Sequence, residues 1–206
     1  MRITGGELRG RRLVAPPERP APRSEAQGRP ARPSNNQGVR PTSDRTRQAI
    51  FNILMHRDFG TGFMLEGAAV ADLFAGTGAL GIEAISHGAR FCLFVDDNPD
   101  SRALTRENIE GLGLTGATKI WRRDATDLGP MNTGSGGPFD LVFLDPPYRK
   151  NLVAPCLKSL KDGSWLKPGA LAVVETDAKE AFDAPDFTTI ETRDYGETRI
   201  TLLTPV

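Results

Sequence analysis

The sequence predicts an α/β fold with one mostly parallel, seven-stranded sheet. From residue 68 onward, short apolar stretches alternate with amphipathic stretches, a pattern typical of a parallel sheet with helices on both faces. The last two apolar stretches, 187–195 and 198–205, flank Gly196 and predict an antiparallel hairpin at the sheet edge.

The remaining elements follow from the same patterns. Apolar runs that would be buried on both faces predict strands at 68–74, 90–96, 118–124, 139–145 and 170–176. Helical spacing, capping residues and closing glycines predict helices at 42–56, 78–88, 99–113 and 152–161.

The N-terminal region has a different composition. Residues 1–14 predict a hairpin of two short strands around Gly5 and Gly6. Residues 15–41 contain seven of the sixteen prolines and predict a disordered or polyproline-like linker. We therefore expect a basic hairpin with a Pro/Arg-rich linker at 1–41, and an α/β domain at 42–206.

Charge is distributed unevenly along the chain. Residues 1–47 contain eleven arginines, no lysine and four acidic residues, a net charge of +7, so the remainder of this neutral chain carries −7. This asymmetry favours a basic arm that meets a polyanion, although a solvated tail with no partner has the same composition. Arginine without lysine favours RNA, because guanidinium groups bind phosphates in a forked geometry and stack on bases.

Several classes of protein are disfavoured. The chain has no run of about 18 apolar residues and no apolar signal-peptide region, so no membrane association is expected. Cys92 and Cys156 form neither a CxxC pair nor a disulfide framework, which favours a cytoplasmic location. No metal site is expected with only two histidines, and a monomer is expected because nothing in the sequence requires an oligomer.

A glycine-rich turn follows the first predicted parallel strand. Gly76-x-Gly78-x-x-Gly81 has the spacing of a dinucleotide fingerprint, and its backbone N–H groups would face a ligand at a helix N-terminus. Asp72 would repel a pyrophosphate but suits the ammonium group of an amino acid, which favours S-adenosylmethionine over NAD. The alternative is a tight turn without a ligand.

Acidic residues follow the next two strands. Asp96, twenty residues after Gly76, is placed to bind both ribose hydroxyls of an adenosine, and we prefer it to Asp97. Asp124 could accept a hydrogen bond from the adenine amino group. Each of these residues could instead cap a helix. Ligands of open α/β sheets bind at this end of the strands.

The stretch FDLVFLDPPY, residues 139–148, joins a buried strand to a stiff loop. Pro146 and Pro147 cannot continue the sheet, because proline has no N–H to donate. Asp145 and a proline-fixed carbonyl could accept hydrogen bonds from an exocyclic amine, and the ring of Tyr148 could stack on its base. A plain strand-end turn is the alternative. We predict a site that methylates an exocyclic amine.

The motifs DLFAGTGALGIEA and FLDPPY together resemble the Rossmann-like class I S-adenosylmethionine-dependent methyltransferases that modify exocyclic amines. The stretches RITGGELRGRRL and RPTSDRTRQAIFNIL resemble the bacterial family that methylates the N2 amino group of one guanine in 16S ribosomal RNA. Only the resemblance implies guanine, because the Asp-Pro-Pro-Tyr motif alone also suits adenine N6.

The resemblance implies a methyltransferase domain at 42–206 and roles for individual residues. The implied catalytic residues are Asp145, Pro146, Pro147 and Tyr148. The implied cofactor-binding residues are Asp72, Phe74, Gly76, Gly78, Asp96 and Asp124. The implied RNA-binding residues, which would contact RNA or cover the pocket, are Arg9, Arg11, Arg12, Arg40, Arg45 and Arg47. The implied partner is 16S ribosomal RNA, in the small ribosomal subunit or an assembly intermediate.

Three alternatives remain at this point. A DNA adenine-N6 methyltransferase could use the same motif, but 206 residues leave no obvious separate target-recognition domain. A non-catalytic RNA-binding assembly factor could retain the fold, although the intact motif argues against it. A NAD-dependent dehydrogenase is disfavoured by Asp72.

Overall fold

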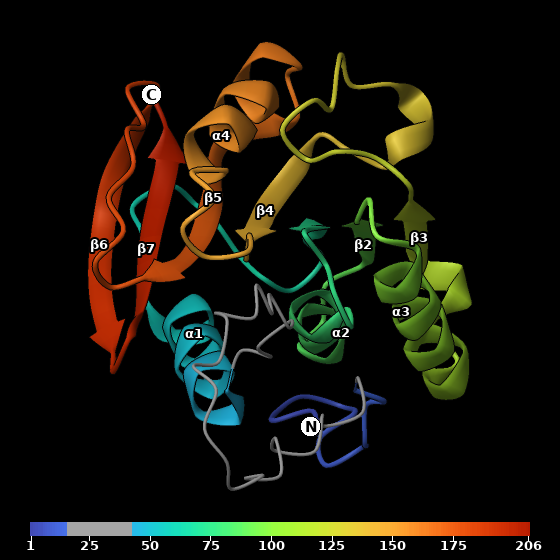
Figure 1. Ribbon diagram of the computed structural model, residues 1–206. Coiled ribbons are helices and arrows are strands. Elements are labelled where there is room, and N and C mark those ends of the chain that lie inside the picture. Colours follow the sequence, from blue (N-terminus) through green and yellow to red (C-terminus); the bar gives the residue numbers. More distant parts are fainter. Residues whose placement is uncertain (16–42) are drawn as a thin grey trace, which may run out of the picture.

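The computed structural model describes residues 1–15 and 43–206, which form a seven-stranded sheet between two layers of helices and loops (Figure 1). The strand order is β3-β2-β1-β4-β5-β7-β6. Pairing is parallel from β3 to β5, and β7 is antiparallel to both of its neighbours. The predicted parallel sheet with a C-terminal antiparallel hairpin is confirmed. The strands are β1 (Ala69–Leu73), β2 (Phe91–Val95), β3 (Thr118–Trp121), β4 (Phe139–Leu144), β5 (Leu166–Asp177), β6 (Phe187–Tyr195) and β7 (Thr198–Pro205).

The helices cover both faces, as predicted. Helices α1, α2 and α3 lie on one face, and α4 lies on the other with the connection between β3 and β4 (Figure 1). Among the described residues, no helix has both the length and the apolar character that a membrane crossing requires. The helices are α1 (Asp44–His56), α2 (Ala79–Ser86), α3 (Pro99–Leu112) and α4 (Val153–Asp162), with short 3₁₀ turns at η1 (Thr115–Ala117) and η2 (Thr133–Ser135).

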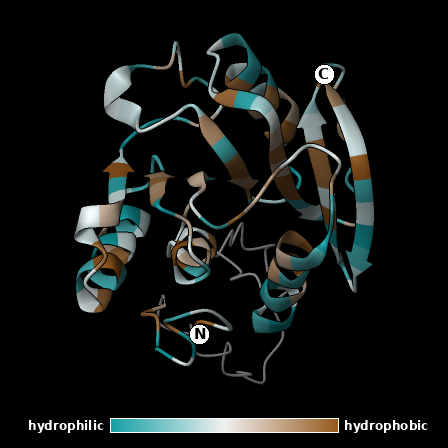
Figure 2. Cartoon of the chain, turned by 180° about the vertical axis from the view of Figure 1, so that it is seen from behind, coloured by the Kyte–Doolittle hydropathy of each residue, from teal (hydrophilic) through white to brown (hydrophobic). Residues whose placement is uncertain are grey.

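Each face of the sheet has its own hydrophobic core. In β1, Val70 packs with the α1–α3 layer, whereas Leu73 packs with the α4 layer, because successive side chains of a strand point to opposite faces. Figure 2 shows hydrophobic residues concentrated in the central strands, whereas the edge strand β6 is largely hydrophilic. Both faces of the central strands are covered, so neither face needs polar side chains, and this explains their continuous apolar runs.

Two strand boundaries differ from the prediction. β5 begins at Leu166 rather than residue 170, and a register irregularity in its pairing with β4 accommodates the extra residues. The Lys167 ammonium lies 2.7 Å from a carboxylate oxygen of Asp140 across this irregular stretch. β3 ends at Trp121 rather than residue 124, where the Trp121 ring meets Trp165 edge to face. The pairing of a strand with its neighbours sets such boundaries, and a periodicity within one strand does not report it.

The N-terminal segment forms a turn closed by a single antiparallel bridge between Arg2 and Arg12, instead of two extended strands. Ile3 and Leu13 are buried against the helices, so the hairpin packs closely on the body. Figures 1 and 2 both place it beyond the helices, on the side away from the sheet. The predicted linker from residue 16 to 41 lies outside the described residues, and the domain division at residue 41 stays a prediction.

Candidate functional site

The predicted site residues follow the carboxyl ends of adjacent strands. The chain leaves β1 toward β2 and β3 on one side and returns to β4 on the other. The direction of winding therefore reverses between β1 and β4, and open α/β sheets bind ligands in the crevice at such a reversal. The glycine turn lies after β1, Asp96 after β2 and Asp145 after β4.

The glycine turn connects β1 tightly to α2. Phe74 has φ 62°, a left-handed conformation that costs about 1–3 kcal/mol in a residue other than glycine. Gly78 has φ 78° at the N-cap of α2, where glycine carries no such cost. A Cβ atom on Gly81 would lie 2.4 Å from the ring of Phe94, so this glycine lets α2 approach β2 closely. The predicted cofactor contacts of Phe74, Gly76 and Gly78 stay predictions.

Two side chains of α3, Thr105 and Asn108, donate hydrogen bonds to the glycine turn. The Thr105 hydroxyl donates to the Gly76 carbonyl at 2.9 Å, and the Asn108 amide donates to the Thr77 carbonyl at 2.9 Å. The Asn108 side chain also accepts from the backbone N–H of Val14 at 2.7 Å. Sequence reasoning missed these two residues, although polar side chains on the inward face of an amphipathic helix were an available signal.

Asp72 lies beneath the turn with an exposed fraction of 1%. Its carboxylate accepts from the Gly81 N–H at 2.9 Å. Burial raises the pKa of Asp72 to about 8, the Gly81 N–H lowers it in part, and the negative charge of Asp96 raises it again. A nearby cation would lower this pKa, so the binding of a positively charged ligand is coupled to release of the Asp72 proton. A direct contact with an ammonium group stays a prediction.

Asp96 is bound to the glycine turn. Its two carboxylate oxygens accept from the N–H groups of Gly76 and Asn98, each at 2.9 Å. Burial is the largest influence on the pKa of Asp96 and raises it. Asn98 caps α3 by accepting from Asp100 and Ser101, so α3 is capped without Asp96. The geometry distinguishes Asp96 from the exposed Asp97, and the ribose contact stays a prediction.

Asp124 has a local role, but it stabilises a turn and does not cap a helix, which was the alternative that the sequence left open. It is exposed, and its Oδ1 accepts from both the N–H and the hydroxyl of Thr126, at 2.8 and 2.7 Å. Burial, and then the charge of Asp124, raise the pKa of Cys156 in α4. No hydrogen bond among the described residues links Asp124 to the glycine turn, and its contact with adenine stays a prediction.

The Asp-Pro-Pro-Tyr loop follows β4, whose last residue pairs with Leu73 of β1. Asp145 is half-buried next to the start of the glycine turn, and its N–H lies 3.5 Å from the Leu73 carbonyl. The Tyr148 hydroxyl donates to Oε1 of Glu175 at 2.9 Å and lies 3.1 Å from the Thr198 hydroxyl. Burial and then Glu175 raise the pKa of Tyr148, so the phenol stays protonated. Glu175, an acid within an apolar strand, was an unused signal in the sequence.

The predicted RNA-binding arginines differ in accessibility. Those that the structure exposes are Arg9, Arg11, Arg12 and Arg45. Arg40 lies outside the described residues. Arg47 corrects the prediction, because its side chain has an exposed fraction of 0% and cannot contact RNA in this conformation. Its Nε donates to Glu83 at 2.9 Å, and its Nη2 donates to Asp44 and to the Arg2 carbonyl.

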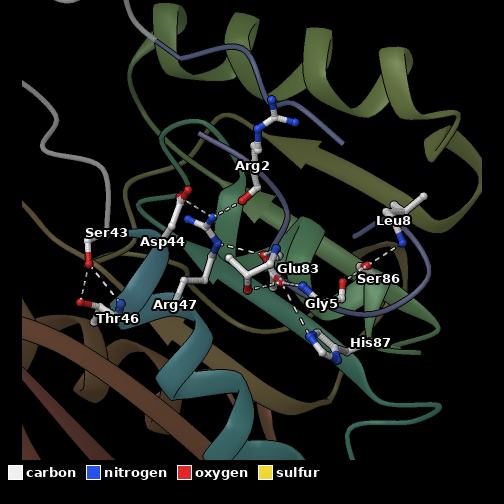
Figure 3. Close-up of polar contacts among 12 residues, drawn as sticks. Arg2, Gly5, Leu8, Ser43, Asp44, Thr46, Arg47, Glu83, Ser86 and His87 are labelled. Carbon is white, nitrogen blue, oxygen red and sulfur yellow. Dashed lines mark hydrogen bonds and ion pairs between the residues drawn. The ribbon is translucent and has the colours of Figure 1, made fainter. Parts of the chain in front are cut away.

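Figure 3 shows how Glu83 of α2 joins the N-terminal hairpin to α1. We call Thr4, Gly5, Arg47, Glu83 and Ser86 the N-terminal clasp. The Glu83 carboxylate accepts from the Thr4 hydroxyl at 2.7 Å, from the Gly5 N–H at 2.8 Å and from Arg47. Burial alone would raise the pKa of Glu83, but His87, whose Nε2 lies 3.7 Å from the carboxylate, and hydrogen bonds from Thr4 and Arg47 lower it to about 2. The hairpin is thus held by a charged, buried group.

The second glycine of the hairpin explains its fit against α2. Gly6 has φ 69°, and a Cβ atom there would lie 1.8 Å from the Ser86 carbonyl oxygen. The Ser86 hydroxyl donates to the Gly5 carbonyl at 2.6 Å and accepts from the Leu8 N–H at 2.9 Å. The stretch RITGGE therefore has a packing role in the clasp, which its basic composition alone did not predict.

The strand order, the glycine turn and the adjacent Asp-Pro-Pro-Tyr loop define a class I methyltransferase, a class whose cofactor is S-adenosylmethionine. The chain belongs to the family described as conserved hypothetical protein 95, whose family model matches residues 23–204. Ribosomal RNA small subunit methyltransferase D of Escherichia coli (strain K12) is 30% identical over 181 residues, which cover 87% of this chain and 76% of that protein. The Haemophilus influenzae protein of the same name is 32% identical over 155 residues, covering 74% of this chain and 75% of that protein.

Solved structures agree with this assignment. An Escherichia coli structure described as a candidate methyltransferase has a TM-score of 0.73 and 26% identity, and the match covers 100% of this chain and 97% of that chain. A hypothetical protein from Thermus thermophilus has a TM-score of 0.69 and 26% identity, with 100% and 99% of the two chains covered. The similarity therefore extends over the whole fold.

Proposed function

We propose that this protein transfers a methyl group from S-adenosylmethionine to the exocyclic N2 of one guanine in 16S ribosomal RNA. The observation that carries the proposal is the position of the Asp-Pro-Pro-Tyr loop, which follows β4 directly beside the glycine turn after β1. The names of the relatives support ribosomal RNA of the small subunit as the substrate. The resemblance of the N-terminal motifs supports guanine N2.

The residues at the strand ends suit a positively charged cofactor. Bound S-adenosylmethionine supplies an electrophilic methyl group on a sulfonium centre. Asp72 and Asp96 place two carboxyl groups of raised pKa at the glycine turn, and a bound cation would lower both pKa values and stabilise the ionised carboxylates. We assign Asp96 to the ribose hydroxyls, and the N–H groups at the start of α2 to the polar end of the cofactor.

The Asp-Pro-Pro-Tyr loop binds and orients the target base. Asp145 and the Pro146 carbonyl accept hydrogen bonds from the exocyclic amine and direct its lone pair toward the methyl group. The ring of Tyr148 stacks on the base, which must leave its helix to reach the loop. No strong base is required, because the amine N–H becomes acidic only as the new C–N bond forms.

We assign the exposed arginines Arg9, Arg11, Arg12 and Arg45 to RNA phosphates. Within this proposal the protein acts as a monomer in the cytoplasm, on the small ribosomal subunit or on an assembly intermediate. Replacing Arg9, Arg11 and Arg12 with alanine should raise the KM for RNA and flatten its salt dependence, because fewer counterions are released on binding. Cofactor affinity should stay the same. Equal salt slopes for the variant and the wild type would contradict this assignment.

Mass-spectrometric nucleoside mapping tests the reaction and the substrate together. We expect 16S RNA from a strain that lacks this gene to lack one N2-methylguanine, and the purified protein with cofactor to restore it. Asp145→Ala should bind the cofactor normally and restore nothing. Restoration by Asp145→Ala would favour an accessory role without catalysis, and activity on duplex DNA alone would favour the adenine-N6 alternative.

A further inference from the structure

Tyr148 is held at the far end of its ring by two strands that the Asp-Pro-Pro-Tyr motif does not include. Its hydroxyl donates to Glu175 of β5 at 2.9 Å and lies 3.1 Å from the hydroxyl of Thr198 in β7. Glu175 has an exposed fraction of only 5%, so this contact is largely removed from water. A hydrogen bond to a carboxylate in such surroundings is among the stronger ones in proteins.

Strand register explains why these groups converge. Thr198 pairs with Asp177, and Glu175 lies two residues before Asp177 on the same face of β5. Val173, a further two residues back, belongs to the core under α1–α3. The anchor of Tyr148 therefore lies on the face of the sheet that also carries α2 and the glycine turn.

The residue after Tyr148 is attached to the same end of β5. The Arg149 guanidinium lies 2.8 Å from a carboxylate oxygen of Asp177, and the Arg149 N–H donates to Glu180 at 2.9 Å. Arg149 and Asn151 have φ of 60° and 55°, conformations that residues other than glycine rarely adopt without such support. The loop is thus held at the Tyr148 hydroxyl and again at the next residue, Arg149.

A stacking surface is useful only when its plane is fixed before the base arrives. A tyrosine ring can turn about two side-chain bonds. A hydrogen bond at the hydroxyl strongly restricts the first, χ1, because that rotation moves the oxygen; the oxygen lies on the axis of the second, χ2, where only the preference of the phenolic O–H for the ring plane resists rotation. This restriction lowers the ordering entropy that base binding would otherwise have to overcome. Phenylalanine would offer the same ring face but no anchor.

We propose that Glu175 and Thr198 are positioning residues that hold the ring of Tyr148 in the plane that receives the target base. The role of the ring as a stacking surface rests on the proposed function, whereas the anchoring itself rests on the contacts of Tyr148.

Steady-state kinetics of methyl transfer test the role in catalysis. We expect Tyr148→Phe, which keeps the ring and removes the anchor, to lower kcat about tenfold with an unchanged KM for the cofactor. Thr198→Val should lower kcat by a smaller factor. In the double variant the two losses should not multiply, because Thr198 acts through Tyr148. Multiplying losses, or a wild-type kcat in Tyr148→Phe, would overturn the proposal.

Ring dynamics give a second readout that needs no RNA. The chain has two tyrosines, so NMR of protein labelled with ¹³C in its tyrosine rings gives two sets of signals, and Tyr195→Phe assigns them. We expect the Tyr148 ring to give NOEs to one set of neighbours in the wild type, as a single χ1 orientation requires, averaged NOEs in Thr198→Val and normal methyl transfer in Tyr195→Phe. Identical ring NOEs in the wild type and Thr198→Val would refute the anchor. Failure of the wild type to methylate RNA would instead refute the proposed function.

Discussion

The N-terminal clasp and the glycine turn each bury one carboxyl group, and the two groups have opposite properties. Glu83 in the clasp accepts from Thr4, Gly5 and Arg47, and its pKa is lowered to about 2 despite burial. Asp72 below the turn accepts from one N–H group, and burial raises its pKa to about 8. Burial acts in the same direction on both, so the partners decide the sign of the shift: several donors including the Arg47 guanidinium at Glu83, and one N–H with the charge of Asp96 nearby at Asp72.

This difference separates a structural charge from a functional one. The charge of Glu83 is neutralised within the protein by an arginine, so the clasp is complete without a ligand. Asp72 has no cationic partner of its own among the contacts that set its pKa. A cation brought by a ligand would supply the opposite charge that Asp72 lacks, which fits the sulfonium and ammonium groups of S-adenosylmethionine.

The largest expected effect is the pH dependence caused by Asp72. Its folded-state pKa of about 8 lies above its unfolded value of 3.8, so the folded protein keeps a proton that the unfolded chain releases. This contribution to stability is fully present below about pH 4 and is lost as the pH rises through 8, by about 6 kcal/mol at the limit. Asp72→Asn keeps an acceptor for the Gly81 N–H and should remove this slope.

Urea unfolding of the wild type and Asp72→Asn from pH 4 to 8 measures this effect as the difference between two curves, which cancels the other titrating groups. Parallel curves would show that Asp72 is ionised in the folded protein. Cofactor binding should also release a proton in the wild type and none in Asp72→Asn, as calorimetry in buffers of different ionisation enthalpy would report.

The second effect concerns the buried ion pair of the clasp. Arg47→Ala leaves the Glu83 carboxylate buried without its guanidinium, and we expect a loss of about 3–5 kcal/mol in the free energy of unfolding. Arg45→Ala, two residues away and exposed, is the matched control and should change stability by less than about 0.5 kcal/mol. Equal stabilities of the two variants would contradict the structural role of Arg47.

A third effect appears at acid pH and has the opposite sign to that of Asp72. The pKa of Glu83 is about 2 in the folded state against 4.5 ordinarily, so its contribution is present above about pH 4.5. It is lost as the pH falls toward 2, by about 3 kcal/mol. Glu83→Gln should flatten the acid limb of the stability curve. An unchanged acid limb in this variant would show that Glu83 does not carry the effect.

The smallest effect concerns the support of the glycine turn by α3. Asn108→Ala removes the hydrogen bonds to Thr77 and Val14, and we expect the Kd for S-adenosylmethionine to rise about tenfold because the turn is less well ordered. Glu107→Ala, on the exposed side of the same helix, should leave the Kd unchanged. Isothermal calorimetry decides between the two, and equal affinities would exclude a role of Asn108 in ordering the turn.

The elements of the fold were predictable because their signals are local. Apolar runs and helical spacing located the strands and helices, and the glycines that end α3 and begin α2 could be identified directly in the sequence. The end of β3 and the start of β5 were misplaced by three or four residues. Those boundaries depend on where β3 stops pairing with β2 and on an irregular register between β5 and β4, both of which involve distant residues.

Chain order and periodicity place Asp96, Asp145 and Tyr148 at strand ends, so the chemical groups that follow each strand could be predicted from the sequence. The role of each group depends on the contacts that it makes in the folded protein. In the sequence, Arg47 does not differ from the other arginines of the basic region. In the fold it is buried and pairs with Glu83, 36 residues away. The Tyr148 hydroxyl forms a hydrogen bond with Glu175, 27 residues away. Burial and hydrogen bonding depend on such long-range contacts, and they set which residues meet solvent and which carboxyl groups keep a proton.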